Sequence, residues 1–288
     1  MPLSQDIITL YDSFTHGLID RRAFMERLGA LAGGAGAATV LLAQLTNNYA
    51  QAAIVAEDDL RLTTSTDSFT APTGPVKAYV ARSKDAAKSG VVIVIHENRG
   101  LNPHIKDIAR RIALEGFTAI APDLLSSAGG TPDDQDLARD MIGKLEAAKT
   151  AAELVAAVAY AKSRPDGNGK VGALGFCWGG GKVNQLAVDA ADLAAGVAYY
   201  GAQPKAEDVP RIKAALLLHY AGKDDRINAG IAAYEAALKA AKTDYQLFVY
   251  DGVNHAFNND TAGERYNKAA ADLAWGRTIG LLKAKLAG

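Results

Sequence analysis

Cysteine is almost absent from this sequence: among 288 residues there is one, Cys177. A single cysteine excludes an intramolecular disulfide and leaves no second thiolate for a cysteine-rich metal site. A C-x-x-C pair is also missing, and with it the resolving thiol that a dithiol redox protein requires. The thiol of Cys177 therefore either packs as a small buried hydrophobe or acts alone.

The chain also lacks an excess of charge of one sign and a phosphate-binding loop. Its net charge is −1 and it has no long acidic or basic run, so nothing predicts a nucleic-acid-binding surface. The glycines at 179–181 lack the Lys-Ser/Thr pair of a phosphate loop, and no cluster of metal ligands is visible. We expect no cofactor and no bound metal.

What is present has the composition of a globular protein, with 49% hydrophobic and 22% charged residues. No internal repeat or long Pro- or Ser-rich linker divides it. The length suffices for one α/β domain with a full core, which we place at residues 53–288. Alanine-rich helices with few exposed aromatic residues favour a monomer.

The N-terminus resembles a twin-arginine export signal. The motif is Asp20–Met25, an uncharged Gly/Ala/Leu stretch runs from Leu28 to Leu45, and Ala50-Gln51-Ala52 fits a small-x-small cleavage site. These features predict that residues 1–52 engage the export machinery and deliver a folded protein to the periplasm or the outside of the cell. A lone cysteine agrees with this route, because no disulfide has to form after export.

Two alternatives for residues 1–52 stay open. The segment could form an ordinary amphipathic helix and a loop. Alternatively, the stretch Leu28–Leu45 is just long enough to be an uncleaved membrane anchor. About twenty residues precede the arginine pair, which is long for a signal.

After this segment, short apolar runs alternate with helical patterns. The run Val91–Ile95 is continuous and β-branched, as expected of a strand covered on both faces. This alternation predicts an α/β fold with a mostly parallel central sheet, helices on both faces, and an active site at the carboxyl ends of the strands. Strands are predicted at 76–82, 91–96, 118–122, 170–174, 195–200, 214–220 and 245–250, and helices at 103–115, 136–163 with one break, 181–187, 232–242 and 262–286.

The segment Gly175-Phe176-Cys177-Trp178-Gly179 lies between a predicted strand and a predicted helix. Strand, sharp turn and helix is the layout of the nucleophile elbow of α/β-hydrolases, G-x-S-x-G, with cysteine in the place of serine. The glycines have a steric purpose, because side chains two residues either side of the nucleophile would collide with the strand and the helix.

An acid and a histidine follow the elbow in the chain order of α/β-hydrolase triads. Asp224 comes after the strand at 214–220, and His255 after the strand at 245–250. Cys177 would attack a carbonyl carbon, His255 would hold the thiol proton or pair with the thiolate, and Asp224 would fix the histidine tautomer. Asp224 could instead cap a turn, and Asp225 is a competitor.

A second group of polar residues, His96-Glu97-Asn98-Arg99, follows the buried strand. A carboxylate at this edge is costly unless paired, so Glu97 either acts as a base toward the thiol or forms a salt bridge with an arginine. The backbone N–H groups of Asn98 and Trp178 are placed to form an oxyanion hole. His96 is predicted to be a buried structural histidine, and we assign no chemistry to His104 or His219.

Together, Gly-x-Cys-x-Gly-Gly, His-Glu, Gly-x-Asp and His-x-Phe resemble the dienelactone hydrolase (carboxymethylenebutenolidase) family over residues 75–285. The resemblance implies an α/β-hydrolase fold with a Cys177–His255–Asp224 triad. It also implies that Glu97 takes the thiol proton when substrate binds. The twin-arginine-like signal and the His-Glu-Asn-Arg-Gly-Leu-Asn segment resemble an exported branch of the family.

Two features depart from the type members of that family, which hold the carboxylate of dienelactone with two arginines. One follows a Pro-Asp-Leu segment, where this chain has Leu125-Ser126-Ser127, and the other is replaced by Asn259. Arg99 could bind the substrate in their place, or could neutralise Glu97.

The sequence therefore predicts a hydrolase of a small ester or lactone that acts through a cysteine acyl-enzyme. A broad-specificity esterase or thioesterase and a non-catalytic binding protein with the hydrolase fold are the alternatives. An intact set of Cys177, His255 and Asp224 argues against the binding protein.

Overall fold

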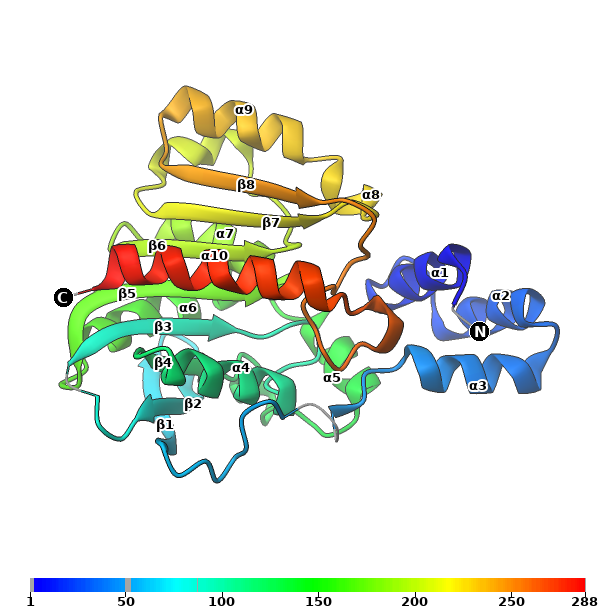
Figure 1. Ribbon diagram of the computed structural model, residues 1–288, viewed down its shortest axis with the longest axis horizontal. Coiled ribbons are helices and arrows are strands. Elements are labelled where there is room, and N and C mark those ends of the chain that lie inside the picture. The colour runs from blue at the N-terminus through cyan, green and yellow to red at the C-terminus, as the bar shows by residue number, and fades with distance from the viewer. Residues whose placement is uncertain (1–2, 50–52, 87, 288) are drawn as a thin grey trace.

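The computed structural model describes residues 3–49, 53–86 and 88–287. Its centre is one eight-stranded sheet with the order β1-β2-β4-β3-β5-β6-β7-β8 (Figure 1). β1 pairs antiparallel with β2, and β2 antiparallel with β4, whereas the other neighbouring strands are parallel. The strands are β1 (Leu62–Ala71), β2 (Gly74–Ser83), β3 (Ser89–Ile95), β4 (Thr118–Pro122), β5 (Gly167–Phe176), β6 (Leu193–Tyr199), β7 (Ala215–Ala221) and β8 (Tyr245–Tyr250). The predicted mostly parallel sheet is confirmed.

Helices cover both faces of the sheet. α4 (Pro103–Leu114) and α10 (Lys268–Leu286) lie on one face, and α6 (Ala147–Ser163), α7 (Trp178–Asp189) and α9 (Ile231–Ala241) lie on the other (Figure 1). The remaining described helices are α1 (Gln5–Thr15), α2 (Arg21–Ala32), α3 (Ala35–Leu45), α5 (Gln135–Ile142), α8 (Asp225–Asn228), and the 3-10 turns η2 (Ser126–Ala128), η3 (Ala206–Arg211) and η4 (Gly263–Arg265).

β3 shows why the sheet is buried on both faces. Val91, Ile93 and Ile95 belong to the core under α6 and α7, whereas Val92 and Val94 belong to the core under α4 and α10. Successive side chains of a strand point to opposite faces, so a strand between two helical layers must be apolar throughout.

The predicted elements differ from the observed ones at a few ends. The break expected within 136–163 is confirmed and lies between α5 and α6. α10 begins at Lys268, because η4 precedes it and the Asn267 side chain caps it by accepting from the Ala270 N–H. β1 was not predicted: it is a polar strand at the edge of the sheet, paired only with β2.

The N-terminal segment forms a small three-helix layer with its own apolar core. Phe14 of α1 stacks on Phe24 of α2, with ring centroids 4.6 Å apart, and Leu28 and Leu45 are buried beside them. Figure 1 shows α1, α2 and α3 beside the carboxyl ends of the parallel strands, the edge where the active site was predicted. We call these three helices the N-terminal cap.

Cationic side chains of the α/β domain hold the cap in place. The guanidinium of Arg139 lies 4.4 Å from the centroid of the Phe14 ring, and that of Arg265 lies 4.8 Å from the Tyr11 ring. Arg265 also donates to the backbone oxygen of Leu45 at 3.1 Å. Such cation–π contacts contribute about 0.5–2 kcal/mol each, depending on desolvation.

The residues read as an export signal thus form folded structure. One arginine of the motif, Arg21, pairs with Asp136 of α5, and the other, Arg22, pairs with Glu26 within α2. The small-x-small site Ala50-Gln51-Ala52 lies outside the described residues. The fold does not test export, which stays a prediction.

The structure gives little support to the alternative in which this segment is a membrane anchor. The apolar stretch Leu28–Leu45 is divided between α2 and α3, whose axes differ by 108°. Within the described residues no single helix combines the length and apolarity needed to cross a membrane, and this bent pair meets the requirement only in length and composition.

Candidate active site

Cys177 occupies a sharp turn between β5 and α7, with φ 55° and ψ −118°. This backbone conformation is strained for a residue with a side chain. A Cβ on Gly175 would lie 2.3 Å from the Gly179 carbonyl oxygen, and one on Gly179 would lie 2.4 Å from the His96 carbonyl oxygen. The steric requirement predicted for these two glycines is confirmed, and the turn holds the sulfur at the carboxyl end of the sheet.

His255 and Asp224 meet at the same edge, as the chain order predicted. His255 lies in the loop after β8, and its Nδ1 is 2.5 Å from Asp224 Oδ2 in the loop after β7. A carboxylate partner fixes the proton on Nδ1 and leaves Nε2 for chemistry. Asp224 also accepts from the Ile227 N–H at the start of α8, so its capping role holds as well. Asp225 is exposed and takes no part in this contact.

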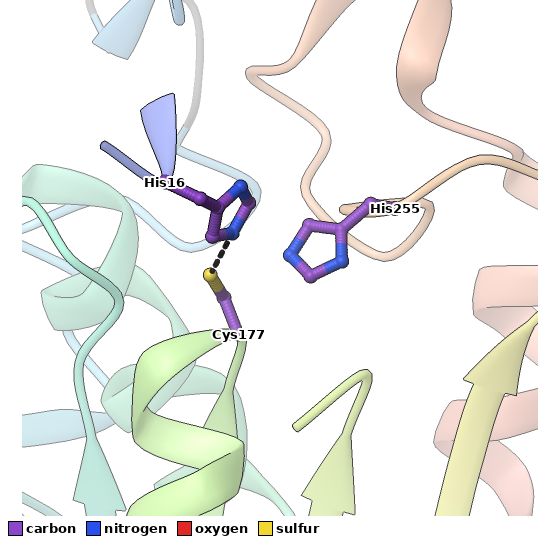
Figure 2. A group of neighbouring side chains, drawn as sticks. All are labelled: His16, Cys177 and His255. Atoms are coloured by element: carbon purple, nitrogen blue, oxygen red, sulfur yellow. Dashed lines mark hydrogen bonds between the residues drawn. The ribbon is translucent and has the colours of Figure 1, made fainter. Parts of the chain in front are cut away.

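A second histidine, His16, reaches the sulfur from the N-terminal cap. Its Nε2 lies 3.2 Å from Cys177 Sγ, and Figure 2 shows this contact with the His255 ring beside it. The rings are 4.8 Å apart and nearly perpendicular. Sequence reasoning missed His16 because the residue lies within the segment assigned to export. The available signal was a histidine at the end of an amphipathic helix whose first turn is capped by Ser4.

The two histidines set the charge state of the sulfur. Burial would raise the pKa of the Cys177 thiol, but His16 and His255 lower it to about 6. Burial would lower the pKa of His16, but the Cys177 thiolate and Asp12 raise it to about 9. Against the same effect of burial, Cys177, Asp12 and Asp224 raise the pKa of His255 well above its usual value. At neutral pH these directions favour a thiolate next to two imidazolium rings.

Glu97 is buried near the site but does not contact the thiol. Its Oε2 accepts from Asn259 Nδ2 at 2.8 Å, and among the described residues the hydrogen-bond partner of Cys177 Sγ is His16. Asn259, which stands in place of one arginine of the type members, therefore holds the glutamate. A direct proton transfer from the thiol to Glu97 stays a prediction.

Arg99 forms an ion pair, but its partner is Asp136 and not Glu97. Its Nη1 lies 3.3 Å from Asp136 Oδ1, and the side chain is buried. It does not line the cavity next to Cys177. The predicted substrate-binding role of Arg99 therefore has no supporting contact.

The predicted oxyanion hole has suitable positions. Trp178 is the first residue of α7, so its N–H has no acceptor within the helix. Asn98 lines the same cavity, and its side chain is held by donating to the Thr15 carbonyl oxygen of the cap at 2.7 Å. The Trp178 amide follows the nucleophile at a helix N-terminus, which favours developing negative charge, and the oxyanion hole itself stays a prediction.

The other three histidines have structural partners. His96 Nδ1 lies 2.7 Å from the Glu97 carbonyl oxygen, and its ring stacks on Trp178. His104 pairs with Asp260, and His219 lies 2.9 Å from the Tyr250 hydroxyl. Burial lowers the pKa of His96, as expected of a structural histidine.

A cavity of about 920 Å³ opens beside the sulfur. Its apolar wall comes mainly from α6 and α7, including Leu154 and Leu186, and its polar wall includes Lys182 and Arg226. Thr15, His16 and Gly17 of the cap complete it. The volume accommodates a small ester with its alcohol and acyl groups.

One nitrogen of His16, one nitrogen of His255 and Cys177 Sγ lie within 4.8 Å of one another, a spacing that a metal ion could bridge. The His16–Cys177 hydrogen bond and the Asp224–His255 pair already account for the positions of these side chains, so we assign no metal ion to them. The sequence did not predict this grouping because it depends on His16.

Comparisons with known proteins agree with the geometry. The family model "Dienelactone hydrolase family" matches residues 76–286, and a model called "YqhI-like" matches residues 2–33. A protein of Saccharolobus solfataricus described as "Putative carboxymethylenebutenolidase" is 33% identical over 244 residues, covering 72% of this chain and 93% of its own.

Solved structures show the same fold. The crystal structure titled "Putative Dienelactone Hydrolase" from Klebsiella pneumoniae is 30% identical with a TM-score of 0.70, covering 76% of this chain and 98% of its own. A dienelactone hydrolase-like promiscuous phosphotriesterase from metagenomic libraries is 25% identical with a TM-score of 0.70, over 78% and 99% of the two chains. The α/β-hydrolase fold is thereby confirmed, whereas none of these comparisons supports an export signal or an exported branch.

Proposed function

Because this chain belongs to the dienelactone hydrolase family, we propose that it hydrolyses a small ester or lactone through an acyl-enzyme on Cys177. The observation that carries the proposal is the buried Asp224–His255 pair facing a cysteine in a nucleophile elbow. These three residues would supply the nucleophile, the acid–base and the orienting carboxylate that the chemistry requires.

The reaction begins when the Cys177 thiolate forms a bond to the carbonyl carbon and the carbonyl π electrons move to oxygen. The backbone N–H groups of Asn98 and Trp178 bind this oxyanion. Collapse breaks the carbon–oxygen bond of the ester, and the leaving alkoxide takes a proton from His255 Nε2. Water then gives a proton to His255 and attacks the thioester, and the sulfur leaves as thiolate.

The substrate range follows from the cavity. The missing arginines weaken recognition of a carboxylate such as that of dienelactone. The remaining candidates for an acidic group are Lys144 and Lys182, which line the cavity and have no ion pair among the described residues. Lys182 lies over the Trp178 ring at 4.9 Å. Burial lowers the pKa of Lys182. The apolar wall from α6 and α7 favours uncharged acyl chains.

The apolar wall also favours a second candidate of the same chemical class, a broad-specificity esterase or thioesterase. A non-catalytic binding protein is a third, and the intact candidate triad disfavours it. We also propose that the protein is a monomer and that it is exported to the periplasm or the outside of the cell. The geometry of this site bears on neither proposal.

The test uses the full chain as wild type, Cys177→Ala and Cys177→Ser. Turnover of p-nitrophenyl acetate, simple lactones, acyl thioesters and dienelactone would be measured, with intact mass after a short substrate pulse. We expect an acyl adduct on the wild type and a loss of at least about 100-fold in kcat/KM for both variants. Most of the activity surviving in Cys177→Ala would overturn the cysteine mechanism, and no turnover on any substrate would favour the binding protein.

A further inference from the structure

His16 contacts the sulfur of Cys177 but has no role in the hydrolysis proposed for Cys177, His255 and Asp224. His16 Nε2 is the hydrogen-bond partner of Cys177 Sγ at 3.2 Å, whereas His255 Nε2 has no hydrogen-bond partner among the described residues. A buried and unpartnered nitrogen beside the nucleophile is available to a leaving group or a water molecule. The two rings therefore stand in different positions toward the reaction.

The orientation of the His16 ring is fixed at Nδ1, the nitrogen that does not contact the sulfur. Its Nδ1 lies 2.8 Å from the backbone oxygen of Asp12 and 3.2 Å from the Asp12 carboxylate. A carbonyl oxygen only accepts, so Nδ1 must carry a proton. Nε2 then exchanges a proton with the sulfur, either accepting from the thiol or, as imidazolium, donating to the thiolate.

The cap that carries His16 is joined to the site on both sides. The Thr15 carbonyl oxygen accepts from the side chain of Asn98, whose backbone is one candidate for the oxyanion hole. The Asp12 carboxylate lies 3.8 Å from the guanidinium of Arg226, which borders the cavity. The last residues of α1 are thus built into the wall of the catalytic cavity.

From these contacts we infer that His16 is a further catalytic residue, whose imidazolium holds Cys177 as a thiolate before any substrate arrives. Asp12 is its positioning residue. The inference rests on the proposed hydrolase function and goes beyond it, because it divides the work between two histidines and makes the N-terminal cap part of the active site.

In this proposal the thiol proton rests on His16 Nε2 before substrate binds, in place of the transfer to Glu97 that the family resemblance implied. When the sulfur attacks, its electron pair forms the carbon–sulfur bond and His16 keeps its proton. His255 alone protonates the leaving alkoxide and later takes a proton from water. When the carbon–sulfur bond breaks, the electron pair returns to the sulfur, which again meets the imidazolium of His16. No proton has to leave the site for the next cycle.

The other charged and titratable groups near the sulfur come from several elements. They are Asp12 on α1, Glu97 after β3, Lys182 on α7, Tyr200 after β6, Asp224 and Arg226 at α8, and His255 after β8. The two groups whose charges most lower the pKa of the thiol, against its burial, are His16 itself and, among these neighbours, His255. Removing one imidazolium should therefore leave a thiol that ionises at higher pH.

The experiment measures the rate of alkylation of Cys177 by iodoacetamide against pH, using the full chain. Because the chain has no other cysteine, the titration reports on Cys177 alone. The variants are His16→Gln and His16→Asn, with Arg22→Gln as a matched control on the exposed face of α2. Circular dichroism would confirm that each variant is folded.

We expect a midpoint near pH 6 in the wild type and in Arg22→Gln. In both His16 variants the midpoint should rise by about one pH unit or more, which lowers the alkylation rate at acidic pH about tenfold. An unchanged midpoint in a folded His16 variant would overturn the inference, as would an equal rise in Arg22→Gln.

The same experiment separates the two proposals, because alkylation needs no ester. A negative titration leaves the hydrolase with His255 as its one catalytic histidine. Absence of turnover on the ester and lactone panel leaves the titration result intact.

Discussion

Two carboxylate–histidine pairs, Asp224–His255 and Asp12–His16, approach the same sulfur from different parts of the molecule. We call them the His255 arm and the His16 arm. The His255 arm belongs to the loops of the sheet, and its side chains are 7% and 1% exposed for His255 and Asp224. The His16 arm belongs to the N-terminal cap and is more open, at 14% and 21% for His16 and Asp12. The first arm is fixed by a carboxylate at 2.5 Å, the second mainly by a backbone oxygen at 2.8 Å.

The difference indicates two tasks. A tightly held, buried dyad with a free Nε2 suits repeated proton transfer to and from reacting groups. A looser histidine already bonded to the sulfur suits electrostatic stabilisation of the thiolate. Substituting His255 and His16 one at a time distinguishes the two tasks.

The largest expected effect is on turnover. His255→Gln should lower kcat/KM about 10³-fold, because the leaving alkoxide and the attacking water both lose their proton partner. His16→Gln should cost only about tenfold at slightly alkaline pH, where part of the thiol ionises without help. Steady-state kinetics with p-nitrophenyl acetate would measure both. Equal losses in the two variants would remove the proposed division of tasks.

The His255 arm was predictable from the sequence and the His16 arm was not. Cys177, Asp224 and His255 follow apolar strands, and parallel strands bring their carboxyl ends to one edge whatever the details of packing. The flanking glycines added a local signature. All of this depends on periodicity and short-range sterics, which a sequence displays directly.

His16 depends on how a separate segment docks. Three short helices with an apolar core of their own can lie anywhere on a domain, and Arg139 and Arg265, which hold them, show no pattern that pairs them with Phe14 and Tyr11. The paired arginines and the Gly/Ala-rich stretch also match export signals. The export interpretation therefore competed with that of an amphipathic helix and a loop, and neither predicts where the segment packs on the domain.

A smaller effect should appear in the titration of the histidines themselves. The Asp12 carboxylate stabilises the imidazolium of His16, so Asp12→Asn should lower the pKa of His16 from about 9 by about one unit. The thiolate–imidazolium pair, present between about pH 6 and 9 in the wild type, would then lose its proton on His16 earlier as pH rises.

Nuclear magnetic resonance of histidine-labelled protein would follow this titration, with His16→Gln to assign the signal. Asp224→Asn is the matched comparison: it should lower the pKa of His255 and the plateau of kcat/KM. If Asp12→Asn left the His16 signal unmoved, the backbone oxygen alone would position the ring and the carboxylate would have no part.

The smallest expected effect requires both arms together. Cys177 Sγ and one nitrogen from each histidine lie within 4.8 Å, so Zn²⁺ should inhibit ester hydrolysis by occupying the nucleophile, and a chelator should restore it. His16→Gln should weaken the inhibition several-fold, because one of the three atoms that an inhibiting ion would contact is gone. Mg²⁺ prefers oxygen ligands and serves as the control that should have no effect. Equal inhibition of the wild type and His16→Gln by Zn²⁺ would show that the ion acts elsewhere, and that the two arms do not close on the sulfur together in solution.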